Sequence, residues 1–427
     1  MIRIYPYGQV PDEEIFARVQ DDRDVSGIVA DIIARVRAQG DKALAAYAEQ
    51  FDGAAPERLE VTGAELDAAV AALDPEFVEI LRQAAANIEA FHKHQVRSSF
   101  VVTDQPGVVM GQKVMPIEKV GLYVPGGTAA YPSSVLMNCI PAKLAGCREI
   151  VMVSPPTCGG DINPVILAAA RIAGVHRVFR TGGAQAVAAL AYGTESVPRV
   201  DKIVGPGNAF VAEAKRQVFG QVAIDMIAGP SEILVVADGK SDPAAVAADL
   251  LSQAEHDKLA SAVLVTDSET LAKAVQAEIE RQLPLLERQE IARASIDNNG
   301  KIIVAGDLAV AVQIANRIAP EHLELCMDNP FDWLDRIQNA WSVFMGRHCP
   351  EALGDYFAGP NHTLPTSGTA RFSSPLSVDD FVKKTQFTYF TGDALERVAG
   401  KVDYFARQEG LTAHARSVTI RFDKTKE

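Results

Sequence analysis

The sequence predicts an α/β protein with two lobes built on parallel-rich sheets, a helical amino-terminal region and an extended carboxyl-terminal tail. Two observations lead to this class. Compact β-branched runs alternate with Ala-rich helical stretches in the middle of the chain, which favours parallel strands joined by right-handed crossovers. The alternation also fills two successive stretches, about 120–230 and 232–350, each long enough for its own sheet.

The first hundred residues have a helical pattern. Apolar side chains recur at helical spacing from Val25 to Phe51, with a break near Gly40, and again from Ala64 to Phe91. Short extended segments, separated by glycine and proline, follow between Phe100 and Lys119. We therefore expect residues 1–119 to form a mainly helical region that leads into the first lobe.

The two lobes are expected to be Rossmann-like, spanning 120–231 and 232–370. After them, residues 371–427 lose the βα rhythm and read as a polar helix-like stretch with a tail. The expected strands are 149–154, 177–180, 202–204, 232–237, 262–266 and 301–305, and the expected helices include 164–173, 184–191 and 211–218.

Composition and charge exclude several classes of protein. The 427 residues carry 41 Lys and Arg against 55 Asp and Glu, a net charge of -14 that disfavours binding to nucleic acid. No apolar stretch approaches the roughly 20 residues that span a bilayer, and the amino end lacks a secretory signal, so we expect a cytoplasmic protein that does not enter membranes. The five cysteines show no CxxC spacing, which indicates buried reduced thiols.

Three glycine-rich turns are candidates for holding a phosphate group. They are 123–128, 181–185 and 204–208, and the last two follow expected strands and precede expected helices. Such turns aim backbone amides and a helix dipole at an anion, so a dinucleotide pyrophosphate fits them. None is GxGxxG, and a βα turn also needs glycine for backbone reasons alone, so the turns by themselves leave both interpretations open.

Candidate metal ligands lie far apart along the chain. Gln253 and His256 are three residues apart, near the end of a helix that begins near Pro243, so they share a face. A solvated helix end explains this pair alone at least as well. Asp355, His362 and His414 lie in polar, loop-like contexts and complete a nitrogen and oxygen set that suits zinc.

Glu321 and His322 are candidates for acid–base chemistry. Pro320 places them at the mouth of an apparent strand, where adjacent side chains are expected to point in opposite directions and to serve different steps. Imidazole titrates at about pH 6.5, which suits the removal of a proton from an alcohol. A purely structural role for either residue remains open at this point.

Together these motifs resemble the histidinol dehydrogenase family. The matching segments run in family order from about residue 120 to 418, and the combination is far more specific than any single motif. They are Gly121–Gly127, Val204–Asn208, Ile224–Glu232, Ser252–His256, Pro320–His322, Gly354–Pro365 and Glu409–His414.

The resemblance implies one zinc ion per subunit, NAD as oxidant and L-histidinol as substrate. It implies an intertwined homodimer, in which the tail is a dimerisation segment and the histidine of the tail reaches the neighbouring subunit's site. The implied zinc ligands, which also contact substrate, are Gln253, His256, Asp355 and His414; the other implied substrate contacts are Ser231, His322, His362 and Glu409, and the implied NAD contacts are Tyr123, Gln185 and Asn208.

The reaction implied by the resemblance consists of two successive oxidations, from L-histidinol to L-histidinaldehyde and then to L-histidine, at the end of histidine biosynthesis. His322 would remove the alcohol proton, and Glu321 would activate water to attack the aldehyde. Three alternatives use the same motifs: a dehydrogenase for another small polar alcohol, a zinc hydrolase that uses Glu321, and a non-catalytic metal-stabilised binding protein.

Overall fold

The computed structural model describes residues 1–18, 24–53, 55–126, 130–157, 160–227 and 229–423. The motif residues Gly127, Thr128 and Ala228, together with Cys158, lie outside the described residues. The chain divides into two compact units. The first is Met1–Val96 with Ile117–Phe381, and the second is Arg97–Pro116 with Val382–Glu427.

The amino-terminal region is mainly helical, as predicted. Gly40 (φ 53°) separates two of its helices in a conformation that glycine tolerates best. Two short strands in this region were not predicted, β1 (Arg3–Pro6) and β2 (Glu60–Val61). The helices are α1 (Asp12–Phe16), α2 (Ser26–Gln39), α3 (Asp41–Phe51), α4 (Gly63–Ala72) and α5 (Pro75–His92).

The first lobe is a six-stranded sheet in the order β2-β7-β6-β5-β8-β9, parallel except for β2. Alternate side chains enter two cores: Leu122 packs on the side of α4–α7, and Val151 on the side of α2, α3, α8 and α9. The strands are β5 (Lys119–Tyr123), β6 (Glu149–Ser154), β7 (Arg177–Arg180), β8 (Lys202–Val204) and β9 (Ala223–Ile224); the helices are α6 (Pro132–Ala145), α7 (Pro164–Ala173), α8 (Gly183–Tyr192) and α9 (Ala209–Val218).

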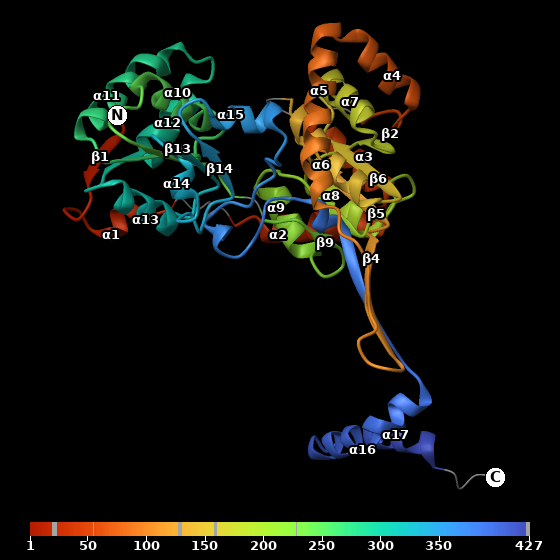
Figure 1. The fold of residues 1–427 in the computed structure, drawn as a ribbon. Coiled ribbons are helices and arrows are strands. Elements are labelled where there is room, and N and C mark those ends of the chain that lie inside the picture. The colour runs from red at the N-terminus through yellow and green to blue at the C-terminus, as the bar shows by residue number, and fades with distance from the viewer. Residues whose placement is uncertain (19–23, 54, 127–129, 158–159, 228, 424–427) are drawn as a thin grey trace. The chain divides into compact units, whose positions relative to one another are not determined.

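The second lobe is an all-parallel six-stranded sheet in the order β1-β12-β11-β10-β13-β14. Val235 packs on the face covered by α10–α12, and Val236 on the opposite face with α13 (Figure 1). The strands are β10 (Glu232–Ala237), β11 (Ser261–Thr266), β12 (Lys301–Val304), β13 (His322–Cys326) and β14 (Ser342–Met345); the helices are α10 (Pro243–Ala254), α11 (Glu269–Gln282), α12 (Gln289–Asn299), α13 (Leu308–Ile318), α14 (Phe331–Leu334) and α15 (Glu351–Leu353), followed by the π-helical turn η3 (Gly354–Ala358).

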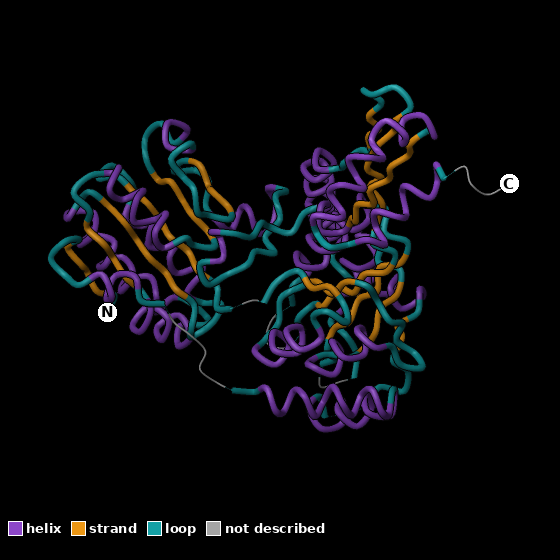
Figure 2. The backbone as a smooth tube through the Cα atoms, turned by 90° about the horizontal axis from the view of Figure 1, so that it is seen from below, coloured by secondary structure: helices purple, strands orange, loops and turns teal. Residues whose placement is uncertain are grey.

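The two sheets have the same doubly wound plan. Figure 2 shows each as a layer of strands with helices on both sides. The chain reverses its direction of winding between β5 and β8 in the first lobe and between β10 and β13 in the second. Two Rossmann-like lobes are thereby confirmed, and each has a switch point at which ligands commonly bind.

The second unit contains a strand that the sequence did not predict. β15 (Val382–Phe390) pairs antiparallel with β4 (Val108–Pro116), which also pairs with β3 (Phe100–Val102). The helices of this unit are α16 (Gly392–Gln408) and α17 (Thr412–Thr419). Among all the described helices, none is long and apolar enough to cross a membrane.

Four cysteines are described, and all four have free thiols. Cys139, Cys147 and Cys326 are buried as expected, whereas Cys349 is only partly buried. Burial raises the pKa of Cys139 and of Cys147 to about 12, so these thiols remain protonated and unreactive near neutral pH.

Candidate active site

A cavity of about 670 Å³ in the first unit is lined by both lobes. The first lobe contributes the turns that follow the carboxyl ends of β5 and β8, and the second contributes residues at the amino ends of β10 and β13. The first lobe's switch point therefore opens onto the cavity, whereas the second lobe borders it with the opposite, amino-terminal edge of its sheet. The predicted site residues in its lining are Asn208, Ser231, Gln253, His256, Glu321, His322, Asp355 and His362.

Gln253 and His256 reach this cavity from the carboxyl end of α10. The helix begins at Pro243, as predicted, with Asp242 as its N-cap, and the backbone N–H of His256 donates to the carbonyl of Gln253 over 3.2 Å. Gln253 is 1% exposed, and its Oε1 finds no hydrogen-bond partner in the described part of the chain. A buried oxygen without a partner is costly, and a bound cation would satisfy it.

Asp355, on η3, supplies a carboxylate close to these groups. Burial alone would raise the pKa of Asp355, but the hydrogen bond from His362, over 3.3 Å, and the nearby His322 together lower it below its ordinary value. Burial lowers the pKa of His256, which favours the neutral imidazole that binds metals. An amide oxygen, a neutral imidazole and a carboxylate fit a zinc ion.

Glu321 and His322 do not point apart, contrary to the prediction. Both line the cavity, and Glu321 Oε2 lies 3.8 Å from His322 Nδ1. The prediction was wrong because β13 begins only at His322, while Glu321 lies in a turn after Ala319, which has a positive φ of 52°. The backbone of one residue contacts both side chains: the N–H of Glu232 donates to Glu321 Oε2 over 2.8 Å, and the carbonyl of Glu232 lies 3.2 Å from His322 Nδ1.

Burial gives this pair opposite titration properties. It lowers the pKa of His322 to about 4, so the imidazole is neutral and able to accept a proton at neutral pH. It raises the pKa of Glu321 well above the usual range, toward the pH at which a carboxylate is an effective base. His322 Nε2 is buried and has no hydrogen-bond partner among the described residues, which leaves it available to a substrate.

The sequence analysis missed Glu351 as a site residue. This side chain starts α15, is 2% exposed and lines the cavity, with Oε1 at 3.9 Å from His322 Nε2. Burial raises the pKa of Glu351 to about 9. Its spacing offered a signal, because Glu351 precedes Asp355 by four residues and a helical turn places such residues on one face.

The turn after β8 presents Asn208 to the cavity. Asn208 is the N-cap of α9, and its side chain accepts hydrogen bonds from the N–H groups of Phe210 and Val211. Gly205 (φ 116°) is held on both sides: its N–H donates to Asp225 over 2.7 Å, and its carbonyl accepts from Lys215 over 2.9 Å. Lys215 and Asp225 also form a buried ion pair with each other.

The remaining predicted residues are not in the described lining of this cavity. Tyr123 and Gln185 are each 4% exposed, and the Tyr123 hydroxyl accepts a hydrogen bond from the N–H of Gly183 over 3.0 Å. Burial raises the pKa of Tyr123 to about 12. Glu409, at the end of α16, and His414, on α17, are exposed residues of the second unit.

Two doubly wound lobes that share a cavity with a glycine-rich switch-point turn and an acid–base pair define the class of an oxidoreductase of the dehydrogenase type. The family model of histidinol dehydrogenase matches residues 17–422. The chain therefore belongs to the histidinol dehydrogenase family.

Individual relatives agree with this assignment along the whole chain. The histidinol dehydrogenase of Syntrophotalea carbinolica is 58% identical over 399 residues, which cover 93% of this chain and 92% of the relative. That of Geobacter metallireducens is 56% identical over 411 residues, covering 95% and 94%. The crystal structure of histidinol dehydrogenase from Elizabethkingia anophelis matches with a TM-score of 0.92 at 39% identity, covering 98% of this chain and 97% of that one.

Proposed function

We propose that the protein is a zinc- and NAD-dependent L-histidinol dehydrogenase of histidine biosynthesis, working in the cytoplasm. It oxidises L-histidinol to L-histidinaldehyde and then to L-histidine, with two NAD consumed. The observation that carries this proposal is the single cavity in which Gln253, His256 and Asp355 lie beside Glu321 and His322. Membership of the histidinol dehydrogenase family supports the choice of substrate.

One zinc ion per subunit would be held by Gln253, His256, Asp355 and the partner subunit's His414. When bound, the zinc ion supplies a positive charge that orients the substrate, and NAD supplies the hydride acceptor. Ser231, His362 and Glu409 would add substrate contacts.

NAD would lie along the first lobe's switch point. Asn208 is well placed for this, because it lines the cavity at the amino end of α9. Tyr123 and Gln185 are proposed as further NAD contacts. Their low exposure means that they would act from beneath the glycine turns rather than from the open cavity.

His322 and Glu321 divide the proton transfers between them. His322, kept neutral by burial, takes the proton of the substrate alcohol as the aldehyde forms. Glu321 takes a proton from the water that adds to the aldehyde, and His322 acts again on the resulting hydrate. The buried setting keeps bulk water from the bound aldehyde, which would otherwise be released or react elsewhere.

We propose that the second unit is a dimerisation segment. Large apolar side chains are exposed on it, among them Val101, Tyr404 and Phe405, at 61%, 68% and 67% exposure. Most of the buried hydrophobic residues that the structure describes in this unit are alanines on α16 and α17, which make a small core. Exposed apolar surface on a small unit is typical of an interface with another chain.

The decisive experiment supplies purified, zinc-loaded protein with L-histidinol and NAD and measures NADH and L-histidine together. We expect two NADH per histidine, because an alcohol becomes a carboxylate by losing two hydrides. Accumulation of aldehyde with one NADH would overturn the second half of the proposal. Rates with simple amino alcohols equal to the rate with L-histidinol would favour a different substrate. A melting temperature that does not change when NAD is added would favour a hydrolase.

A further inference from the structure

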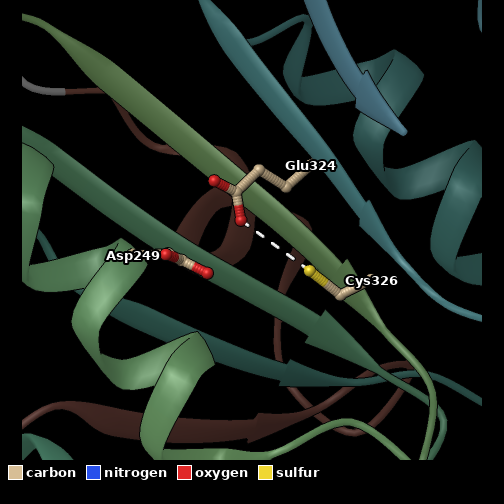
Figure 3. A group of neighbouring side chains, drawn as sticks. All are labelled: Asp249, Glu324 and Cys326. Atoms are coloured by element: carbon tan, nitrogen blue, oxygen red, sulfur yellow. Dashed lines mark hydrogen bonds between the residues drawn. The ribbon is translucent and has the colours of Figure 1, made fainter. Parts of the chain in front are cut away.

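A cluster of two carboxyl groups and a thiol lies between α10 and β13, and none of its residues is in the lining of the cavity. It consists of Asp249, Glu324 and Cys326 (Figure 3), and one oxygen of each carboxyl and the sulfur all lie within 4.8 Å of one another. Glu324 is 1% exposed and hydrogen-bonded to the carboxyl of Asp249, and the Cys326 thiol contacts Glu324 Oε2 over 3.8 Å. None of these residues has a role in the reaction proposed above.

Glu324 links three segments of chain. Its Oε1 accepts the backbone N–H of Glu351 over 2.7 Å, at the start of α15, while its carboxyl also meets Asp249 on α10. Glu324 itself belongs to β13. Hydrogen bonds from one buried carboxyl therefore connect α10, β13 and the α15–η3 segment.

Each of these segments also carries a residue of the proposed active site. It lies four residues away in the helical segments and two residues away on the strand. Gln253 follows Asp249 by four residues on α10, and Asp355 follows Glu351 by four residues. His322 precedes Glu324 by two residues on β13, so both side chains lie on the same side of the strand. A shift at Glu324 would thus be transmitted to all three site residues.

The hydrogen bond between Glu324 and Asp249 fixes the positions of both side chains, which apolar packing alone would not do. Burial raises the pKa of Glu324 to about 9 and also raises the pKa of Asp249. A protonated Glu324 can donate to the Asp249 carboxylate and still accept from Glu351. An apolar residue would fill the same space without the cost of desolvation, so the polar group is best explained by the directional bonds that it makes.

We propose that Glu324 is a positioning residue, which ties α10, β13 and the α15–η3 segment together and so sets the spacing of Gln253, His322 and Asp355. The inference rests on the proposed function, because it concerns the same metal and acid–base site. It assigns Glu324 no contact with substrate or metal.

The test compares the zinc affinity of Glu324→Leu and Glu324→Gln with that of the wild type, by titration of Zn²⁺ against a competing chelator. Glu324→Leu loses both hydrogen bonds, and we expect its zinc affinity to fall by about tenfold or more, as for other residues that orient metal ligands. Glu324→Gln keeps an oxygen for Glu351 and an N–H for Asp249, so it should retain most of the wild-type affinity.

Cys326→Ala is the matched control, since it removes a side chain from the same side of β13 without breaking the links, and its zinc affinity should be unchanged. Affinities are measured on folded protein, well below the unfolding temperature, because a merely structural residue would lower the Tm without changing the affinity of folded molecules. Wild-type affinity in Glu324→Leu, or a Gln variant as weak as the Leu variant, would overturn the proposal.

Should Glu324→Leu fail to fold, Asp249→Ala decides the matter. It breaks only the tie to α10, so zinc affinity should fall while the Glu324–Glu351 bond persists, and an unchanged affinity would refute the tie. The titration needs neither histidinol nor NAD. If the wild-type protein binds zinc but forms no NADH, the proposed reaction is wrong. The role of Glu324 would still be decided by the zinc titration.

Discussion

An imidazole that burial keeps neutral has a ring nitrogen free to accept a proton at neutral pH, and it gives that proton back readily because its pKa is low. His322 is 4% exposed, and burial lowers its pKa to about 4. Its Nε2 lies 3.9 Å from Glu351 Oε1. His322 is therefore expected to act in both oxidation steps, since each requires removal of a proton from an oxygen of the substrate.

His322→Asn should slow NADH formation from both histidinol and histidinaldehyde, by about 10²- to 10⁴-fold, because a positioned general base is typically worth that much. Zinc content, measured by metal analysis, should stay normal, since His322 is not among the proposed ligands. The exposed His348 provides the control, and His348→Asn should behave as the wild type. Wild-type turnover in His322→Asn would contradict the assignment.

Glu321→Gln should slow the two oxidation steps by different amounts. The amide keeps an oxygen for the N–H of Glu232 but cannot take a proton from water, so oxidation of the aldehyde should lose more rate than oxidation of the alcohol. Single-turnover experiments that start from histidinol and from histidinaldehyde measure the two steps separately. Equal losses in both would count against water activation by Glu321.

Which residues of the site could be read from the sequence depended on local spacing. Gln253 and His256 share a helix end, and their pairing was visible as a three-residue spacing. The directions of the Glu321 and His322 side chains could not be predicted. They depend on the backbone near Ala319, whose positive φ is not indicated by its residue type. Glu351 was missed because a buried carboxyl in the sequence looks like any solvated one.

At the scale of elements, the strands at the centre of each sheet were the most predictable. Runs such as Glu232–Ala237 are buried on both faces and β-branched, and their observed bounds match the prediction. Most of the unpredicted strands lie at sheet edges: β1 and β2 are short, and β15 carries lysine and threonine side chains that face solvent. Their pairing depends on partners far away in the sequence. The exception is β5, which lies in the middle of the first sheet and was not among the expected strands.

The turn after β8 carries an element-scale prediction, because the buried Lys215–Asp225 pair holds Gly205 from both sides. Lys215→Met leaves Asp225 without its partner, and breaking such a buried pair costs about 3–5 kcal/mol of unfolding free energy. The KM for NAD should also rise, since the turn that carries Asn208 loses a support. Urea denaturation and steady-state kinetics measure the two effects.

The double variant Lys215→Met with Asp225→Leu separates stability from binding. Apolar replacement of both partners is often neutral, so much of the stability should return. Gly205 would still lack both of its side-chain partners, so the KM for NAD should stay high; its return to normal would contradict the role of the pair. Arg216→Met, which breaks an exposed ion pair next to Lys215, should cost less than about 1 kcal/mol.

At the scale of the whole molecule, the sequence predicted two sheets because the βα alternation occurs twice, and both sheets are present. It did not predict that the first strand of the chain joins the second sheet, where β1 pairs with β12 across nearly 300 residues of sequence. Long-range pairing of this kind is decided by which sheet edge is free, a property of the assembled molecule and not of any local pattern.

The shared active site is a prediction at the same scale. If the partner subunit's His414 completes the zinc site, His414→Ala and Gln253→Ala damage the same site from different chains. A heterodimer of the two variants then has one site with both defects and one site with none. Random mixing makes half of the dimers heterodimers, so the mixture should recover about a quarter of the wild-type activity and purified heterodimers about half.

The mixing experiment uses two affinity tags, so that heterodimers are purified and subunit exchange is proven before activity is measured. Each variant alone should be nearly inactive, because each lacks one of the four proposed ligands. As a control, a mixture of Gln253→Ala with Asp355→Ala should stay inactive, since both ligands come from the first unit of one chain and every site in the heterodimer keeps a defect. Inactive, purified heterodimers of Gln253→Ala and His414→Ala would rule out a histidine shared across the interface, and zinc would then have to be bound within one subunit.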